Sequence, residues 1–534
     1  MRPRPLMPIA VLVLLASGCG DAFTAEDATT AAPTTTTRTA QTAATTTTGG
    51  GDTATTTTTT TEAPAPTMVR VEADGGGDVP DLTAAVAVAA PGATIELGPG
   101  VHTVDGEVPI SGDLTITGGG RAETEVVGTQ GWAVLRYDGG GTLTISGVTL
   151  RRDGGGDAMV VEGGTIEFVG VAFTGAESTP DGGGGDGLLV RGDTTGRLRR
   201  CAMSGNANNG LSVTGRADVL VVETRAAQNG QNGFAVYDEA LATMRDAEAV
   251  NNGLHGFSAH ETTTVTIDNG TAERNASAGI RASGSAALTV TGTSASENGL
   301  SGFIVTDGAL ADLTGNTSTG NGESGFVWFD DSSGTAEGNT APDNTYQGFA
   351  VTGNATPLLS GNTASGNTES GFYVYGAATP TLDGNIATGN GMAGFEFADT
   401  SAAHVAGNTA DANLGSGFGW RDSASGLAVG NTASRNTLHG FRVRDSATPT
   451  LSFDVAADNT EVGFRAADAA APVIEDCTAS GHTTAGFAFY DASGGVLRGN
   501  EAFDNRIGLF VATGSTVAVE ANDWHDNDTD TLIE

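Results

Sequence analysis

The sequence contains no lysine and few positive charges of any kind. Its 24 cationic side chains are all arginine, 63 side chains are acidic, and the formal net charge is −39. A chain of this charge repels the phosphate backbone, so nucleic acids are excluded as partners. The same charge favours the solubility of a long, many-stranded protein.

Long apolar runs are also missing, and the longest stands near the start of the chain. Residues 6–16 follow two arginines, are too short to span a bilayer, and indicate an export signal over residues 1–19. The signal ends in Ala-Ser-Gly-Cys, which resembles the lipobox of bacterial lipoproteins, although Leu15 is one position farther from the cysteine than that family prefers. The resemblance implies a lipid anchor on Cys19 and an extracytoplasmic, cell-surface location.

Half of residues 24–67 are threonine, and most of the others are Ala, Gly and Pro. A segment of this composition cannot build a packed core. We therefore expect residues 20–67 to be a disordered tether between the lipid anchor and a folded domain.

The 3.6-residue spacing of amphipathic helices is absent from the repeats that follow. Instead, a glycine returns every 23 residues fourteen times, from Gly187 to Gly486, and phenylalanine follows it in eleven cases. Apolar residues alternate after the glycine, as in strands, and Gly, Asn and Asp separate the short runs. Three short strands and three bends in 23 residues predict one coil of a parallel β-helix.

Positions are numbered here from this glycine, taken as 0. Equivalent positions on successive coils lie about 4.8 Å apart and form columns. Position −7 is nearly always Ala, position −4 is Asn from Asn206 to Asn459, and position −9 is Asn from Asn316 to Asn431. Stacked Asn side chains bond to one another and to turn backbone, so we interpret both Asn columns as structural.

Cysteine is scarce in the repeats. Cys201 and Cys477 both occupy position −9 and are twelve repeats apart. Their expected separation, on the order of 58 Å, excludes a disulfide between them. We interpret both as substitutes within the column.

These columns, with Asn in the turns and aromatic rings inside, resemble the right-handed parallel β-helix proteins of the pectin-lyase-like superfamily. Residues 74–100 resemble that superfamily's opening strand, short capping helix and first coil, with Asp81 at the start of the helix and Pro91-Gly92 at its end. The resemblance implies an all-β, single-stranded right-handed β-helix of about nineteen coils. It implies no single activity, because the superfamily includes lyases, hydrolases, esterases, epimerases and non-enzymes.

The folded part divides into three segments. Its first coils are irregular, and its last coil breaks the period because Gly508 follows Gly486 after only 22 residues. We expect a cap and irregular coils over 68–186, regular repeats over 187–508, and a last coil with a C-terminal cap that includes Trp524 over 509–534.

On the strand after the glycine, positions +2 and +4 face outward, on the surface where the resemblance places the superfamily's substrate groove. Aromatic, acidic and basic residues gather there late in the chain: Tyr373, Tyr375, Glu396, Arg421, Arg442, Arg444 and Arg465. Exposed rings suit sugars and guanidinium groups bind carboxylates through paired hydrogen bonds, so these residues predict a site for a carboxylated or sulfated glycan. The alternatives are packing between neighbouring rings and surface pairs between the arginines and Asp at +5.

Catalytic signatures of the superfamily are missing. The one compact group that resembles an acid–base cluster is His260 and Glu261 beside Tyr237 and Asp238. His255 occupies position −1 and is interpreted, like His439, as a turn residue.

Metal-binding patterns are weak. Asp526, Asp528 and Asp530 alternate as in calcium loops, but the glycine and the closing glutamate of such loops are missing. Aspartate at +5 in eight repeats is interpreted as turn chemistry. We expect no cofactor, with calcium as the alternative.

The functional hypothesis is a monomeric surface lipoprotein that binds extracellular polysaccharide without turnover. The first alternative is a polysaccharide lyase, glycoside hydrolase or epimerase acting on a glycan that contains uronic acid. The second is a structural or adhesive stalk.

Overall fold

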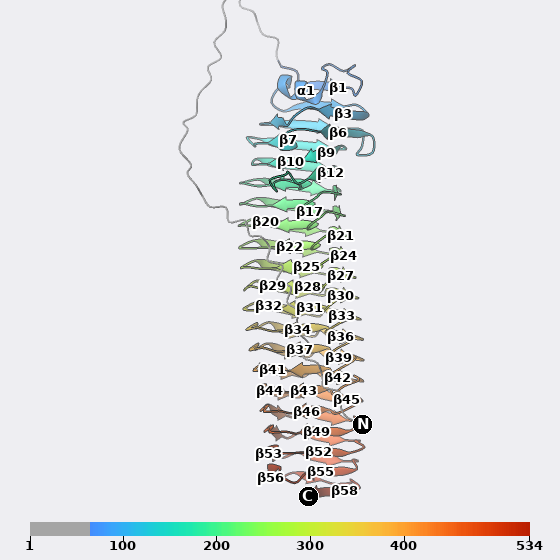
Figure 1. The fold of residues 1–534 in the computed structure, drawn as a ribbon, viewed down its shortest axis with the longest axis vertical. Coiled ribbons are helices and arrows are strands. Elements are labelled where there is room, and N and C mark those ends of the chain that lie inside the picture. Colours follow the sequence, from blue (N-terminus) through green and yellow to red (C-terminus); the bar gives the residue numbers. More distant parts are fainter. Residues whose placement is uncertain (1–64) are drawn as a thin grey trace, which may run out of the picture. The chain divides into compact units, whose positions relative to one another are not determined.

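The computed structural model describes residues 65–534. The expected export signal, Cys19 and almost all of the expected tether lie outside these residues. From β1 (Met68–Val71) onward the chain winds into a parallel β-helix whose strands form three sheets (Figure 1). Sheet A has 20 strands and sheets B and C have 19 each, which confirms the expected solenoid. No helix within the described residues is long and apolar enough to cross a membrane.

A regular coil contributes one strand to each sheet. In one coil these are β43 (Phe418–Trp420) in sheet C, β44 (Ser425–Val429) in sheet A and β45 (Thr432–Ser434) in sheet B, and the chain then returns to sheet C as β46 (Phe441–Val443). β43 and β46 are parallel, with Phe418 opposite Phe441. Residues 23 apart are therefore neighbours on adjacent coils.

Sheet C carries the outward face that is described in the next section. Besides β43 and β46, twelve of its strands hold or adjoin the residues discussed there. They are β10 (Asp157–Val161), β13 (Leu188–Val190), β16 (Leu211–Val213), β19 (Phe234–Val236), β22 (Phe257–Ala259), β25 (Ile280–Ala282), β31 (Phe326–Trp328), β34 (Phe349–Val351), β37 (Phe372–Val374), β40 (Phe395–Phe397), β49 (Val462–Ala466) and β52 (Ala485–Phe489).

A short helix covers the N-terminal end of the core, as predicted. α1 (Leu82–Val88) begins after Asp81, whose side chain accepts a hydrogen bond from the amide of Ala84 at 2.8 Å. Leu82 and Ala85 are fully buried in the core. The N-terminal coil therefore does not leave its apolar interior open.

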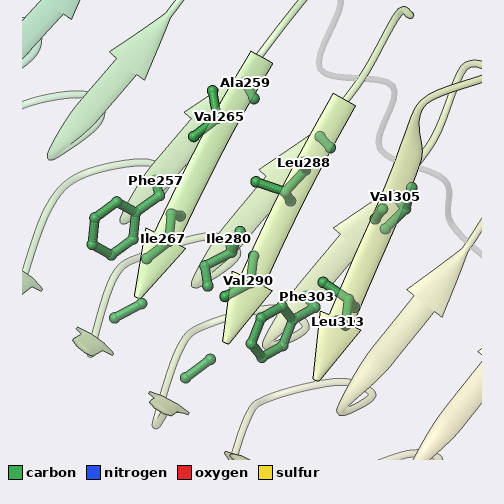
Figure 2. Packing of buried hydrophobic residues seen from close by; sticks show 14 of the residues in the cluster. Phe257, Ala259, Val265, Ile267, Ile280, Leu288, Val290, Phe303, Val305 and Leu313 are labelled. Carbon is green, nitrogen blue, oxygen red and sulfur yellow. The ribbon is translucent and has the colours of Figure 1, made fainter. Parts of the chain in front are cut away.

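The core is a set of stacked side-chain columns. Phe349 and Phe372 stack with ring centroids 4.8 Å apart and planes inclined by 5°. Figure 2 shows the same arrangement where Phe257, Ile280 and Phe303 follow one another along sheet C. Burial of one large ring per coil makes this column the main apolar stabilisation of the regular repeats.

The glycine column is required by space. A Cβ atom on Gly417 would lie 2.7 Å from the Cβ of Ala433 and 2.8 Å from the carbonyl oxygen of Gly440. The glycines of this column do not have positive φ angles, so backbone freedom is not the reason for them. Position 0 and the Ala column at −7 meet at a corner that leaves no room for a larger side chain.

Both Asn columns are structural, as interpreted from the sequence. Asn385 Nδ2 donates to Asn408 Oδ1 and to the carbonyl of Leu359, each at 2.9 Å. In the other column, Asn390 Nδ2 donates to Asn413 Oδ1 at 2.9 Å. Each side chain thus joins two coils and satisfies turn backbone that would otherwise be buried without partners.

The two described cysteines substitute for Asn in the position −9 column. Both are free and buried. Cys477 Sγ lies 3.5 Å from the carbonyl oxygen of Leu451, the kind of acceptor that Asn uses at this position. Burial raises the pKa of Cys201 to about 11, so its thiol is unreactive.

The C-terminal segment continues the coil pattern. Asn500 Nδ2 donates to Asn522 Oδ1 at 2.9 Å, and Asn505 Nδ2 donates to Asn527 Oδ1 at 3.0 Å. Trp524 is partly buried against the core, 5.2 Å from the Phe487 ring, in the capping position expected for it. Calcium binding by the aspartates of this segment stays the alternative to the expectation of no cofactor.

Candidate functional site

The outward face of sheet C carries three adjacent columns, at positions −1, +2 and +4, which we call the outer strip. Asn209 at −1 donates to Ser212 at +2 at 3.0 Å, and the rings of Tyr373 at +2 and Tyr375 at +4 lie 4.6 Å apart. The three columns therefore touch in the order −1, +2, +4.

The outer strip is closely packed where its outward side chains are small. Val327 and Ala350 point outward at +2, yet only 4% and 3% of their surfaces are exposed. The neighbouring positions −1 and +4 are similarly buried, as at Ser324 (4%) and Thr352 (8%), so the three columns form a closely packed face along the stacking direction of the coils.

The seven predicted binding residues all lie on the outer strip, but they form two different groups. The first is internally paired. Arg421 is 3.3 Å from Glu396 Oε1, 2.5 Å from Asp422 Oδ2, and donates to the Tyr373 hydroxyl. The Tyr373 and Tyr375 rings are half-buried and stack on each other, so they do not present free faces as expected.

Glycine at +2 makes this paired group possible. Gly419 occupies the position between Glu396 and Arg442 in the column. A Cβ on Gly419 would lie 2.4 Å from Glu396 Oε2. The carboxylate of Glu396 therefore lies over Gly419 and faces the arginines, while burial raises its pKa.

The second group consists of Arg442, Arg444 and Arg465, of which only Arg444 has an acidic partner. Arg442 and Arg465 lie directly opposite each other on β46 and β49. Neither has a carboxylate within ion-pair distance among residues 65–534, whereas Arg444 pairs with Asp445 at 3.0 Å. Arg465 lies over the Tyr490 ring at 5.0 Å. Burial and the charges of Arg444 and Arg465 lower the pKa of Arg442.

Three buried polar atoms around Arg442 have no hydrogen-bond partner within the described part of the chain: Arg442 Nε, His439 Nδ1 and Ser416 Oγ. His439 and Ser416 occupy position −1 on adjacent coils, next to the +2 column. Burial and the nearby Arg465 and Arg442 lower the pKa of His439 to about 3, so its ring is neutral at pH 7. The surroundings of Arg442 thus hold two positive charges and unused hydrogen-bonding groups. Such surroundings suit a ligand that carries an anionic group and hydroxyl groups.

The structure divides the predicted acid–base group into a pair of stacked rings and two carboxylates of a turn. The Tyr237 and His260 rings stack at 5.0 Å, with planes inclined by 6°. His260 Nδ1 is 2.8 Å from Ser283 Oγ, and its Nε2 contacts Ser258 Oγ. Burial lowers the pKa of His260 to about 4 and raises the pKa of Tyr237 to about 12.

Asp238 and Glu261 belong to the turn at +5, and neither forms a hydrogen bond or ion pair with the His260 ring. Asp238 has φ of 60° and accepts from the amide of Gly215 at 2.9 Å, while Glu261 accepts from the amide of Asp238 at 3.0 Å. The later aspartates do the same, as when Asp445 accepts from the amide of Asp422 at 3.1 Å. The interpretation of this column as turn chemistry is confirmed.

Sequence reasoning missed two carboxyl groups at the same end of the strip. Asp157 and Asp186 are adjacent at position −1, and Asp157 Oδ1 accepts from the amide of Asp186 at 2.8 Å. Burial and the charge of Asp186 raise the pKa of Asp157 to about 7. The available signal was the position of Asp186 directly before Gly187, in the column that holds Asn209 and His255.

Comparison with family models decides the assignment of the chain. The model described as "Right handed beta helix region" matches residues 132–295, 255–410 and 404–532.

The chain belongs to this right-handed β-helix family. The solenoid is therefore right-handed, as the resemblance implied. No curated protein matches the chain.

Solved structures with similar folds include a double mutant of the periplasmic alginate epimerase AlgG, with 15% identity, a TM-score of 0.34, and coverage of 68% of this chain and 84% of that one. The A-module of the Azotobacter vinelandii mannuronan C-5 epimerase AlgE4 has 18% identity, a TM-score of 0.29, and coverage of 64% and 86%. The catalytic domain of a GH87 α-1,3-glucanase has 11% identity, a TM-score of 0.35, and coverage of 61% and 67%. These likenesses concern the fold alone.

Proposed function

We propose that the outer strip binds an extracellular acidic polysaccharide, with its carboxylates at Arg442 and Arg465, and does not turn it over. The observation that supports this proposal is the placement of Arg442 opposite Arg465 on adjacent strands, with no carboxylate partner for either in residues 65–534. Two adjacent, partly buried cations lose hydration and repel each other, and a bound anion would offset that cost.

The shape of the strip favours a linear polymer over a compact anion. Its columns repeat from coil to coil with unbroken strand pairing, for example Phe418 opposite Phe441 and Arg442 opposite Arg465. A chain of sugars can follow such columns and place hydroxyl groups against His439 and Ser416. The lipid anchor and the tether, which remain proposals, would hold the binding domain outside the cell.

The test uses a β-1,4-glucan in which part of the glucose is oxidised to glucuronate, and the same glucan without oxidation. We expect the protein to retain the oxidised glucan, and Arg442→Gln to weaken retention about tenfold. Arg435→Gln is the matched control, because Arg435 is an exposed arginine in the turn after β45 that pairs with Asp411. Equal retention of both glucans, or no loss in Arg442→Gln, contradicts the proposal.

The second candidate function is turnover of a uronate-containing chain at Tyr237 and His260. The observation that favours it is the stacked pair of rings with a neutral imidazole, next to Arg281 on the following coil, whose charge further lowers the pKa of His260. A neutral imidazole can remove the proton from the ring carbon beside a carboxylate that Arg281 holds. A C=C bond then forms to the next ring carbon, the bond from that carbon to the glycosidic oxygen breaks, and the Tyr237 hydroxyl gives its proton to the leaving oxygen. New unsaturated or reducing ends, lost in His260→Gln but kept in His255→Asn, would establish turnover.

A further inference from the structure

The column at position −2, which borders the outer strip, alternates in character from coil to coil. We call it the flanking column. Its members in chain order are Leu254, Ser277, Leu300, Glu323, Tyr346, Glu369, Met392, Gly415, Leu438 and Glu461. Large apolar residues thus occur on every second coil, and serine, glycine or glutamate occurs between them.

The apolar members face solvent. The exposed fractions of Leu300, Tyr346 and Met392 are 38%, 45% and 51%. Such exposure of one large apolar side chain has no meaning by itself. Its regular recurrence beside the outer strip over the coils from Leu254 to Met392 makes it a candidate contact surface.

The backbone holds the flanking column in strict register. The amide of Tyr346 donates to the carbonyl of Glu323, the amide of Glu369 to that of Tyr346, and the amide of Met392 to that of Glu369, each at 3.1 Å. The apolar side chains are therefore spaced by two coils, about 9.6 Å, and their positions do not depend on a flexible loop.

The intervening glutamates lean toward the outer strip. Glu323 Oε2 is 3.5 Å from Ser301 Oγ, Glu369 accepts from Gln347 Nε2, and Glu461 Oε2 is 3.4 Å from His439 Nε2. Each partner occupies position −1 on the preceding coil. From Leu300 to Met392 the flanking column thus presents an apolar group and a hydrogen-bond acceptor alternately.

We infer that the strip and the flanking column together bind a β-1,4-linked glycan, in which each ring is turned over relative to its neighbours. One edge of such a chain presents ring C–H groups and hydroxyl groups alternately, and this pattern repeats every two rings. The C–H groups pack on Leu300, Tyr346 and Met392, and the hydroxyl groups donate to the glutamates between them. This inference rests on the proposed function and names the backbone geometry of its ligand.

The glutamates also restrict the charge of the glycan. A carboxylate on every ring would lie beside Glu323 and Glu369, which have no arginine on the neighbouring coils, because no Arg occurs between Arg281 and Arg421. The carboxylates of the glycan and those of the two glutamates would repel each other. The inferred ligand therefore carries acidic groups on only part of its rings.

The experiment compares two partly oxidised glucans of equal length and equal glucuronate content, one β-1,4-linked and one α-1,4-linked. We expect the full chain to bind the β-linked polymer at least tenfold more tightly. The informative variant is the exchange Tyr346→Glu with Glu369→Tyr, which keeps composition and charge but breaks the two-coil spacing. It is expected to remove most of the preference for the β-linked polymer.

Leu358→Glu is the control, because Leu358 is an equally exposed leucine (41%) on sheet A, away from the strip. Circular dichroism and the thermal transition show whether each variant remains folded; if the exchange variant unfolds, Tyr346→Ser provides the same test with one substitution. Equal affinity for the two polymers, or a preference that survives the exchange, overturns the inference. If either of these results is found and Arg442→Gln still loses binding, the inference is overturned but the proposed function stands. If the protein binds neither polymer, the inference and the proposed function are both overturned.

Discussion

Asn431 Nδ2 donates to Asp454 Oδ1 at 2.9 Å, while Asp454 Oδ2 is fully buried without a hydrogen-bond partner among residues 65–534. The Asn column at −9 is thus interrupted by an acid. Asn431 itself donates to the carbonyl of Val405, 26 residues earlier, and the equivalent acceptor for position 454 is the carbonyl of Ala428. Aspartate can donate there only when it is protonated.

Asp454→Asn is therefore expected to stabilise the protein by about 1–3 kcal/mol at pH 8, because it supplies the missing donor and removes a buried charge. Thermal unfolding of both proteins measures the effect. Asn385→Asp, which places an acid in the intact part of the same column, is the reverse control and should destabilise the protein by a similar amount.

The stabilisation by Asp454→Asn depends on pH in a defined direction. Burial raises the pKa of Asp454 to about 7, so the folded state holds its proton more tightly than the unfolded state does. The wild-type contribution is favourable below the ordinary pKa of aspartate and is lost as pH rises toward 7. The difference in Tm between variant and wild type should be larger at pH 8 than at pH 4, and an equal difference would contradict this account.

His255 is expected to show the opposite pH dependence. Burial and the charge of Arg281 lower its pKa to about 3, and the ring accepts from the amide of Ala278 at 3.2 Å. The unfolded state therefore takes up a proton more readily, and stability is lost as pH falls below the ordinary pKa of histidine. His255→Asn extends the column of Asn209 and Asn232. The Tm of this variant minus the Tm of the wild type should be larger at pH 5 than at pH 7.

Gly417→Ala is expected to destabilise the protein by about 3 kcal/mol or more, because its Cβ would meet backbone and Ala433 on the next coil, where neither can move freely. Gly106→Ala is the control, since nothing lies within 4 Å of a Cβ at that position. A small shift in Tm for Gly417→Ala would show that the coils can separate at this corner.

Glu396→Gln should strengthen retention of the oxidised glucan severalfold. The carboxylate of Glu396 neutralises Arg421 at 3.3 Å and its field reaches Arg442, so the neutral amide leaves more positive charge for the ligand. Glu475→Gln is the matched control, because Glu475 pairs with Arg498 on sheet A. Weaker retention in Glu396→Gln would place Glu396 among the groups that hold the sugar.

The sequence predicted the columns because repetition makes each position visible many times. Phe349 and Phe372, the Asn columns and Gly417 could be assigned from spacing alone, and the structure agrees. The hydrogen-bond and ion-pair partners of single outward side chains could not be assigned in this way. Whether Arg421 pairs with Glu396 while Arg442 remains unpaired depends on Gly419, which frees space for one carboxylate and has no counterpart in the neighbouring coils. Asp157 lies before the regular repeats, so its alignment with Asp186 required the actual strand pairing.

A crystal structure of the protein with a partly oxidised β-1,4-glucan oligosaccharide tests the central claim most directly. The account predicts a glucuronate carboxylate within hydrogen-bond distance of both Arg442 and Arg465, and a chain that follows the outer strip past Met392. A sugar bound on sheet A or sheet B, or a chain on the strip whose carboxylates avoid both arginines, would contradict it.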